Sequence, residues 1–223
     1  MGLRSGEKTG LRFQVTHQNK MFYFTVVAVV SMLSYYFSNQ FPIYPSQELP
    51  YTLVDHAVPL MPNTIWIYAS MYPMMFICFF LVFHRLDILE RGYKAFLVLQ
   101  LITFLIFIFY PVIYPRHLFP LPTDMPFGTK FVFETIRKAD QPINCCPSLH
   151  VANSFLCSLF VWKAERKKGM ACLAWSVIIS FSTMSTKQHY FYDVATGTIF
   201  ALMAYWVFFK TDLFSNIFQA KEE

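Results

Sequence analysis

The chain has 223 residues, of which 56% are hydrophobic and only 14% are charged, and its formal net charge is +5. This composition excludes an ordinary soluble domain, in which about a quarter of the residues are charged, and it indicates an integral membrane protein. The small positive charge is spread over loops, so we interpret it as a determinant of membrane topology and expect no nucleic-acid partner.

Uncharged stretches along the chain predict its membrane helices. A hydrocarbon core of ~30 Å is crossed by ~20 apolar residues in a helix. Six stretches that lack Lys, Arg, Asp and Glu approach this length, and they predict an all-α, polytopic bundle of six transmembrane helices in one catalytic domain, residues 21–210. The stretches are 21–40, 64–84, 95–115, 141–162, 169–186 and 194–209, and the last two are short for full spans.

The segments outside these stretches have separate predicted roles. Residues 1–20 form a polar cytoplasmic segment, and the apolar run after them reads as a retained signal anchor, because no small-residue cleavage site follows it. Residues 211–223 form a charged cytoplasmic tail. Two short surface helices are expected, within 51–61 and over 129–139, in segments that would partly roof a cavity.

Charge asymmetry predicts the orientation. With six spans, both termini lie on one side together with the loops 84–94 and 163–168, and this side holds 13 of the 18 Lys and Arg residues. The positive-inside rule then predicts cytoplasmic termini. Arg116 and the two polar motifs described next fall at the opposite surface, which is outer, periplasmic or lumenal.

The first motif is Pro147-Ser148-Leu149-His150, which follows Cys146 and opens a new hydrophobic run. A proline in the first turn favours the start of a helix. Helix starts leave backbone N–H groups unpaired, which suits an anion. His150 adds an acid or base to this position.

The second motif runs from Ser182 to Asp193 and contains His189 four residues before Asp193. This spacing predicts that the two side chains share a helix face if the segment is helical. Ionisable groups within a membrane are costly and tend to be functional. We therefore expect the two motifs to meet in one phosphate-handling active site.

Two imidazoles and a carboxylate suit nucleophilic phosphoryl transfer. His189 would attack phosphorus to form a phosphohistidine, while Asp193 holds its other ring nitrogen. His150 would protonate the leaving oxygen as general acid. The five cysteines show no spacing of a zinc site, so we expect neither a metal nor another cofactor.

Three further residues are candidates for binding the phosphoryl oxygens, which carry the charge of the transition state. They are Arg116, Ser148 and Lys187. Each also has a simpler interpretation. Arg116 can be an interfacial anchor, Ser148 a helix cap and Lys187 a boundary lysine.

At these residues the sequence resembles the type 2 phosphatidic acid phosphatase superfamily, whose fold is shared with vanadium haloperoxidases. The resemblance covers roughly residues 116–197, within a motif region of 110–197. Pro147-Ser148-Leu149-His150 matches the Pro-Ser-Gly-His motif except at Leu149, and Ser182, His189 and Asp193 have the spacing of the third motif. Gly197 matches its trailing glycine. The resemblance implies a helical membrane enzyme that acts on lipid phosphoesters through the histidine.

The departures from the family pattern bear on the substrate. The superfamily pattern begins with a Lys and Arg-Pro stretch, to which Arg116 is the weakest match, since Phe109 stands where its lysine would be seven residues earlier. Thr183 stands in place of the arginine that follows the serine in the superfamily's Ser-Arg…His…Asp motif. A phosphodiester carries one negative charge and needs fewer cations than a phosphomonoester dianion. The motif forms look more like the sphingolipid-synthase branch, which includes inositol phosphorylceramide synthases and transfers a phospho-headgroup from a phospholipid donor to a lipid alcohol acceptor.

Two other functions remain open from the sequence. One is a lipid phosphate phosphatase acting on phosphatidate, a sphingoid-base phosphate or a polyprenyl pyrophosphate. The other is a non-catalytic membrane transporter or scaffold, although such a protein gains nothing from His150, His189 and Asp193 at that depth. The sequence indicates neither the lipid nor the oligomeric state.

Overall fold

The computed structural model describes residues 13–211, and the described part is helical, without a β-strand. Residues 1–12 of the predicted N-terminal segment and 212–223 of the predicted tail lie outside it. The α-helices are α1 (Lys20–Gln40), α2 (Leu53–Ala57), α3 (Ile65–Ala69), α4 (Met71–Leu81), α5 (Leu86–Phe109), α6 (Phe127–Ala139), α7 (Leu149–Ala164), α8 (Arg166–Ser185) and α9 (Phe191–Lys210). Two 3-10 turns, η1 (Pro62–Thr64) and η2 (Arg116–Leu118), complete the set.

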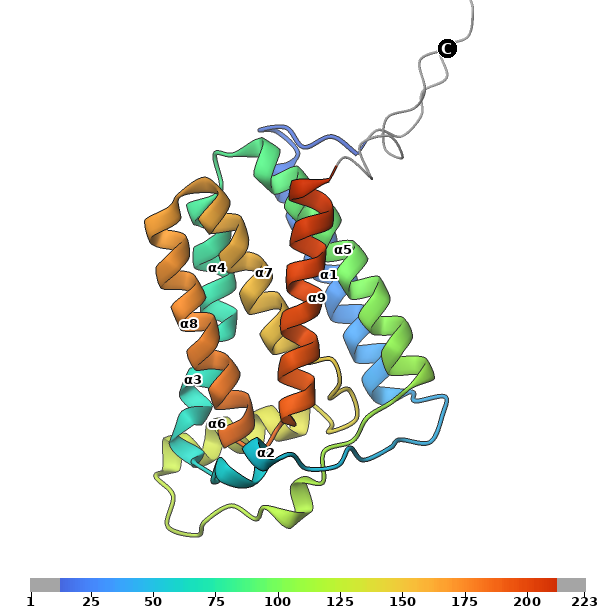
Figure 1. Cartoon of the computed structure of the whole chain (residues 1–223), viewed down its shortest axis with the longest axis vertical. Coiled ribbons are helices and arrows are strands. Elements are labelled where there is room, and N and C mark those ends of the chain that lie inside the picture. Colours follow the sequence, from blue (N-terminus) through green and yellow to red (C-terminus); the bar gives the residue numbers. More distant parts are fainter. Residues whose placement is uncertain (1–12, 212–223) are drawn as a thin grey trace, which may run out of the picture.

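The long helices run side by side along the long axis of the molecule, while α2 and α6 lie across one end (Figure 1). Helix α1 begins and helix α9 ends at the opposite end (Figure 1). Helix α7 packs against α4, α5, α8 and α9. Twelve of its 16 residues are buried, so it forms the centre of the bundle.

The prediction of six membrane spans is not confirmed. Four helical stretches in residues 13–211 are long and apolar enough to cross a membrane: Lys20–Gln40, Pro62–Leu81, Leu86–Phe109 and Phe191–Lys210. Helix α7 has only 16 residues, and α8 begins with Arg166, Lys167 and Lys168, which lower its hydropathy. Because α7 is enclosed by other helices, its surface contacts protein and carries serines that lipid would not accept.

Some helix boundaries differ from the predicted stretches. Helix α5 begins at Leu86, nine residues before the uncharged run, because charged residues are tolerated in its first turns outside the hydrocarbon. The basic segment 163–168, predicted as a loop, includes the first turn of α8. The second predicted span is divided at Ser70 into α3 and α4. Pro73 explains this break, because it has no N–H for the carbonyl of Ala69.

The end of the bundle near α2 and α6 is closed by three connecting segments. Val112 forms isolated parallel bridges with both Gln47 and Asn144, which ties the segments after α1, α5 and α6 together. Helix α2 forms within the predicted segment 51–61, and α6 covers the predicted amphipathic stretch 129–139. The two surface helices therefore cover the end of the bundle where the polar motifs lie.

Candidate active site

The start of α7 places His150 in the first helical turn. Ser148 is the N-cap, and its hydroxyl oxygen accepts a hydrogen bond from the N–H of Val151 at 3.4 Å. Pro147 therefore precedes the cap instead of occupying the first helical position, which corrects the sequence interpretation. Ser148 has the capping role that its simpler interpretation predicted.

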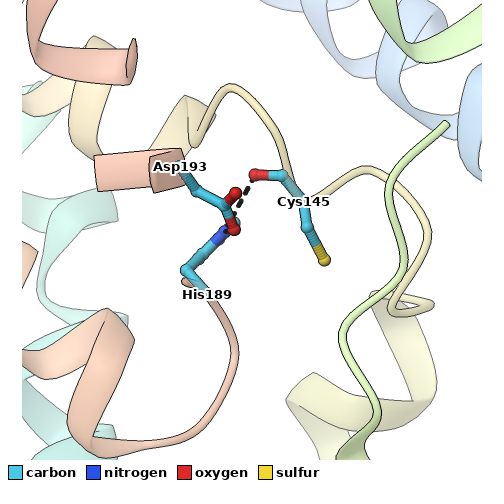
Figure 2. A group of neighbouring side chains, drawn as sticks. All are labelled: Cys145, His189 and Asp193. Atoms are coloured by element: carbon cyan, nitrogen blue, oxygen red, sulfur yellow. Dashed lines mark hydrogen bonds and ion pairs between the residues drawn. The ribbon is translucent and has the colours of Figure 1, made fainter. Parts of the chain in front are cut away.

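The start of α9 orients the other histidine. Tyr190 is the N-cap and Asp193 lies in the first turn, so His189 precedes the helix. The condition for a shared helix face of His189 and Asp193 is therefore not met, since only Asp193 is helical. Their side chains still meet, because Nδ1 of His189 lies 3.1 Å from Oδ2 of Asp193 and 3.0 Å from the carbonyl oxygen of Cys145 (Figure 2). The same carboxylate oxygen accepts the N–H of Tyr190 at 2.9 Å.

The two helix starts are joined through their backbones. The N–H of Ser148 donates to the carbonyl oxygen of Asp193 at 3.0 Å. Gly197 permits this approach, because a Cβ at that position would lie 2.5 Å from the carbonyl oxygen of Ser148. The glycine thus lets α7 and α9 come close enough to bring the two motifs together.

The imidazoles of His150 and His189 face each other with ring centroids 5.9 Å apart. Nδ1 of His189 is engaged by Asp193 and Cys145, which leaves Nε2 for chemistry. His150 is buried, its Nδ1 lies 3.2 Å from the hydroxyl of Tyr68, and its Nε2 has no hydrogen-bond partner within residues 13–211. Each ring therefore has one nitrogen held by the protein and one nitrogen without a protein partner.

Arg116 reaches the same region but is paired with a carboxylate. Its Nη1 donates to the backbone oxygen of Asp140 at 2.5 Å, and its Nη2 lies 3.5 Å from the Asp140 carboxylate. The Nε of Arg116 is buried, and no partner for it lies in the described part of the chain. The Nε–H of this guanidinium is therefore a buried donor that the described residues leave unpaired.

Lys187 lies beneath α2. Its ammonium donates to the backbone oxygens of Val58 and Asp55, at 2.5 and 3.2 Å, and lies over the ring of Phe119. Burial lowers the pKa of this amine, and the nearby Asp55 partly offsets the shift. In this arrangement Lys187 fastens α2 to the segment before α9.

Cys145 completes a group whose donor atoms lie within 4.8 Å of one another, together with His189 and Asp193. Such a group resembles a set of metal ligands, but its chemistry fits a metal poorly. Nδ1 of His189, the ring nitrogen beside Asp193, is already engaged by the Asp193 carboxylate and the carbonyl oxygen of Cys145. The thiol donates to the backbone oxygen of Pro142, and the carbonyl of Cys145 faces His189 (Figure 2).

An apolar cavity of about 470 Å³ extends between α1, α4, α5 and α7, and His150 and Asp140 are among its lining residues. Its volume lies in the ~300–1,000 Å³ range of small-molecule pockets. It runs beside α7 from Leu149 to Phe160, which is ~16 Å at 1.5 Å per residue. Along α1 the lining extends from Phe24 to Asn39, ~22 Å, so the cavity covers more than half of the ~30 Å hydrocarbon core.

Sequence reasoning missed Asp140 and Tyr68. Asp140 accepts hydrogen bonds from the hydroxyls of Tyr35 and Tyr68 and pairs with Arg116. The available signal was weak: Asp140 ends the polar segment shortly before the first motif. Asp55, in α2, is linked to the start of α9, because its Oδ1 accepts the N–H of Phe191 at 2.8 Å.

Comparison with known families decides the affiliation. A family model described as the PAP2 superfamily matches residues 44–207, which is most of the chain. The chain belongs to the PAP2 superfamily. A search of curated proteins finds no match. Membership of the PAP2 superfamily indicates a membrane-bound lipid phosphatase or phosphotransferase, and the match does not single out the sphingolipid-synthase branch.

Proposed function

We propose that this PAP2 protein transfers a phospho-headgroup from a phospholipid to a lipid alcohol through a phosphohistidine on His189. One observation carries the proposal: two imidazoles lie with centroids 5.9 Å apart, and one of them, His150, lines a long apolar cavity. The imidazoles supply a nucleophile and an acid, and the cavity suits a hydrocarbon chain.

In the first half-reaction, Nε2 of His189 attacks phosphorus and the bond to the diacylglycerol oxygen breaks. The leaving oxygen takes the proton from Nε2 of His150, which becomes neutral. Asp193 accepts the hydrogen bond from Nδ1 of His189 and offsets the positive charge that develops on the ring.

In the second half-reaction, the lipid alcohol attacks phosphorus and the bond to His189 breaks. His150 removes the proton of the attacking hydroxyl and returns to the imidazolium form, so the two steps balance. The unpartnered Nε–H of Arg116 and the first N–H groups of α7 suit the phosphoryl oxygens. Ser148 and Lys187 would assist by holding α7 and α2 in place.

The limited number of cations supports transfer of a phosphodiester over hydrolysis of a monoester. Arg116 is half neutralised by Asp140, and the ammonium of Lys187 is bound to two carbonyl oxygens. Phe109 and Thr183 stand where the family pattern has cations. A singly charged diester suits such a site better than a dianion does.

The test uses purified protein in detergent with headgroup-labelled phosphatidylinositol or phosphatidylcholine, with and without ceramide as the lipid alcohol. We expect label on ceramide only when ceramide is present, inhibition by vanadate, and loss of transfer in His189→Ala but not in His84→Ala, which lies exposed between α4 and α5. Inorganic phosphate released from phosphatidate would instead assign a phosphatase. Turnover of none of these lipids would contradict an enzymatic role.

A further inference from the structure

His150 is connected to a second carboxylate that the mechanism above does not use. Its Nδ1 lies 3.2 Å from the hydroxyl of Tyr68, and that hydroxyl lies 3.4 Å from Oδ2 of Asp140. The three residues come from α7, α3 and the position just after α6. The Tyr68 and His150 rings also stack, with centroids 4.2 Å apart and planes inclined by 33°.

Hydrogen-bonding rules fix the direction of this chain of contacts. An ionised carboxylate only accepts, so the single hydroxyl proton of Tyr68 is donated to Asp140. The phenol oxygen then accepts, so Nδ1 of His150 must carry a proton. This tautomer leaves Nε2 to hold or release the second proton, and Nε2 is the buried nitrogen without a partner in the described part of the chain.

We propose that Tyr68 and Asp140 are positioning residues that hold His150 with Nε2 toward the phosphoryl group and stabilise its imidazolium form. The proposal rests on the proposed function, because it assigns these residues to the acid step of that reaction. The chain of contacts from His150 through Tyr68 to Asp140, called the relay below, resembles the His189–Asp193 pair. It differs in that a phenol lies between the imidazole and the carboxylate. The site then holds two histidines and two carboxylates, one carboxylate for each ring.

The position of Asp140 supports this role. It is largely buried, and its other oxygen accepts the hydroxyl of Tyr35 from α1. Arg116 binds the backbone oxygen of Asp140 more closely than its carboxylate, at 2.5 against 3.5 Å. The Asp140 carboxylate therefore retains negative charge, which can stabilise the His150 imidazolium through the Tyr68 hydroxyl between them.

The experiment exploits the leaving group. Protonation by His150 is required when an alkoxide leaves, as in a phospholipid, but not when nitrophenolate leaves. Single-turnover rates of the first half-reaction are measured for a phospholipid and for a phosphodiester with the same headgroup and p-nitrophenol as leaving group. We expect Tyr68→Phe to lower the phospholipid rate about 10-fold and Asp140→Asn about 100-fold, and both to leave the nitrophenyl rate within about threefold.

A double-mutant comparison separates this relay from a merely structural role. In a His150→Ala background, Tyr68→Phe should cause no further loss, because the group that it positions is absent. Equal losses on both substrates, or wild-type rates on both, would overturn the proposal. Tyr68→Phe keeps the ring and removes one hydroxyl, so it tests the relay even if Asp140→Asn fails to fold. If the wild-type protein turns over neither substrate, the proposed function itself fails.

Discussion

At the scale of single residues, the pair His189–Asp193 is the most tightly determined part of the site. Oδ2 of Asp193 lies 3.1 Å from Nδ1 of His189 and also accepts the N–H of Tyr190 at 2.9 Å. The carboxylate thus caps α9 and orients the nucleophile with the same atom. Capping needs only an oxygen, whereas stabilising the developing imidazolium needs negative charge.

Asp193→Asn separates these two roles. The amide oxygen can still accept both hydrogen bonds, so we expect the midpoint of thermal unfolding to stay near that of the wild type. The rate of headgroup transfer should fall about 10²–10⁴-fold, the range of a displaced acid–base partner. The matched control is Asp87→Asn, at an exposed position at the start of α5, which should be active. A fully active Asp193→Asn protein would contradict the assignment.

The residues that could be predicted from the sequence are those whose partners are close along the chain. His189 and Asp193 are four positions apart, and Ser148 and His150 two, so local patterns identified them. Tyr68 and Asp140 meet His150 only after α3, α6 and α7 have packed. An isolated Tyr in an apolar helix carries no sequence signal of such a contact.

At the scale of elements, the cavity is narrowed where Gly92 of α5 lies against Phe160 of α7. A Cβ at Gly92 would lie 3.0 Å from the ring of Phe160, and both residues line the cavity. The two positions therefore limit the room for a hydrocarbon chain at this level of the cavity. Phe160 lies ten residues along α7 from His150, or ~15 Å.

Gly92→Val should shorten the cavity and Phe160→Ala should lengthen it. Removing room for two methylenes costs ~1.6 kcal/mol of burial, or about 10-fold in kcat/KM. We expect Gly92→Val to lose activity with long-chain phospholipids and keep it with short-chain ones, and Phe160→Ala to shift the preference the other way. Measuring kcat/KM over a series of chain lengths tests this, and an unchanged profile in both variants would show that the chain binds elsewhere.

The close approach of α7 and α9 is a second element-scale feature. Gly197→Ala would place a Cβ 2.5 Å from the carbonyl oxygen of Ser148, which is backbone and cannot turn away. The helices must separate, so we expect a loss of ~1–3 kcal/mol in stability and most of the activity. The control is Gly128→Ala in α6, where the nearest atom would lie 3.7 Å away. Thermal unfolding in detergent and transfer assays on both variants provide the comparison.

The elements were predicted best where hydropathy alone determines them. Helix α1 begins and ends within one residue of its uncharged stretch, because lipid and not protein surrounds most of it. Helix α7 starts at Leu149, eight residues after its predicted stretch begins. The residues before Leu149 form a connecting segment instead, in which Asn144 makes a β-bridge with Val112. Uncharged residues buried in protein and uncharged residues in lipid look alike in a sequence.

At the scale of the whole molecule, α7 and α8 pack in one bundle with the four apolar stretches that are long enough to cross a membrane. The connection between α7 and α8 lies at the same end as the α4–α5 connection, and α6 lies at the other end (Figure 1). We propose that six helical segments cross the membrane: α1, α3 together with α4, α5, α7, α8 and α9. The termini would then be cytoplasmic, and the site would lie at the outer or lumenal face. Because α7 contacts α4, α5, α8 and α9, we expect α7 and α8 to reach as deep into the membrane as their neighbours do.

Cysteine accessibility tests this topology. His84, Glu165 and Asp124 are exposed, in the α4–α5 connection, the α7–α8 connection and the segment before α6. In sealed vesicles of known orientation, we expect a membrane-impermeant maleimide to label Asp124→Cys from the outer or lumenal side. His84→Cys and Glu165→Cys should react only from the cytoplasmic side. The wild-type protein controls for its own five cysteines. Labelling of Glu165→Cys together with Asp124→Cys would leave α7 and α8 as a hairpin that does not cross, because the connection would then share the face of the active site.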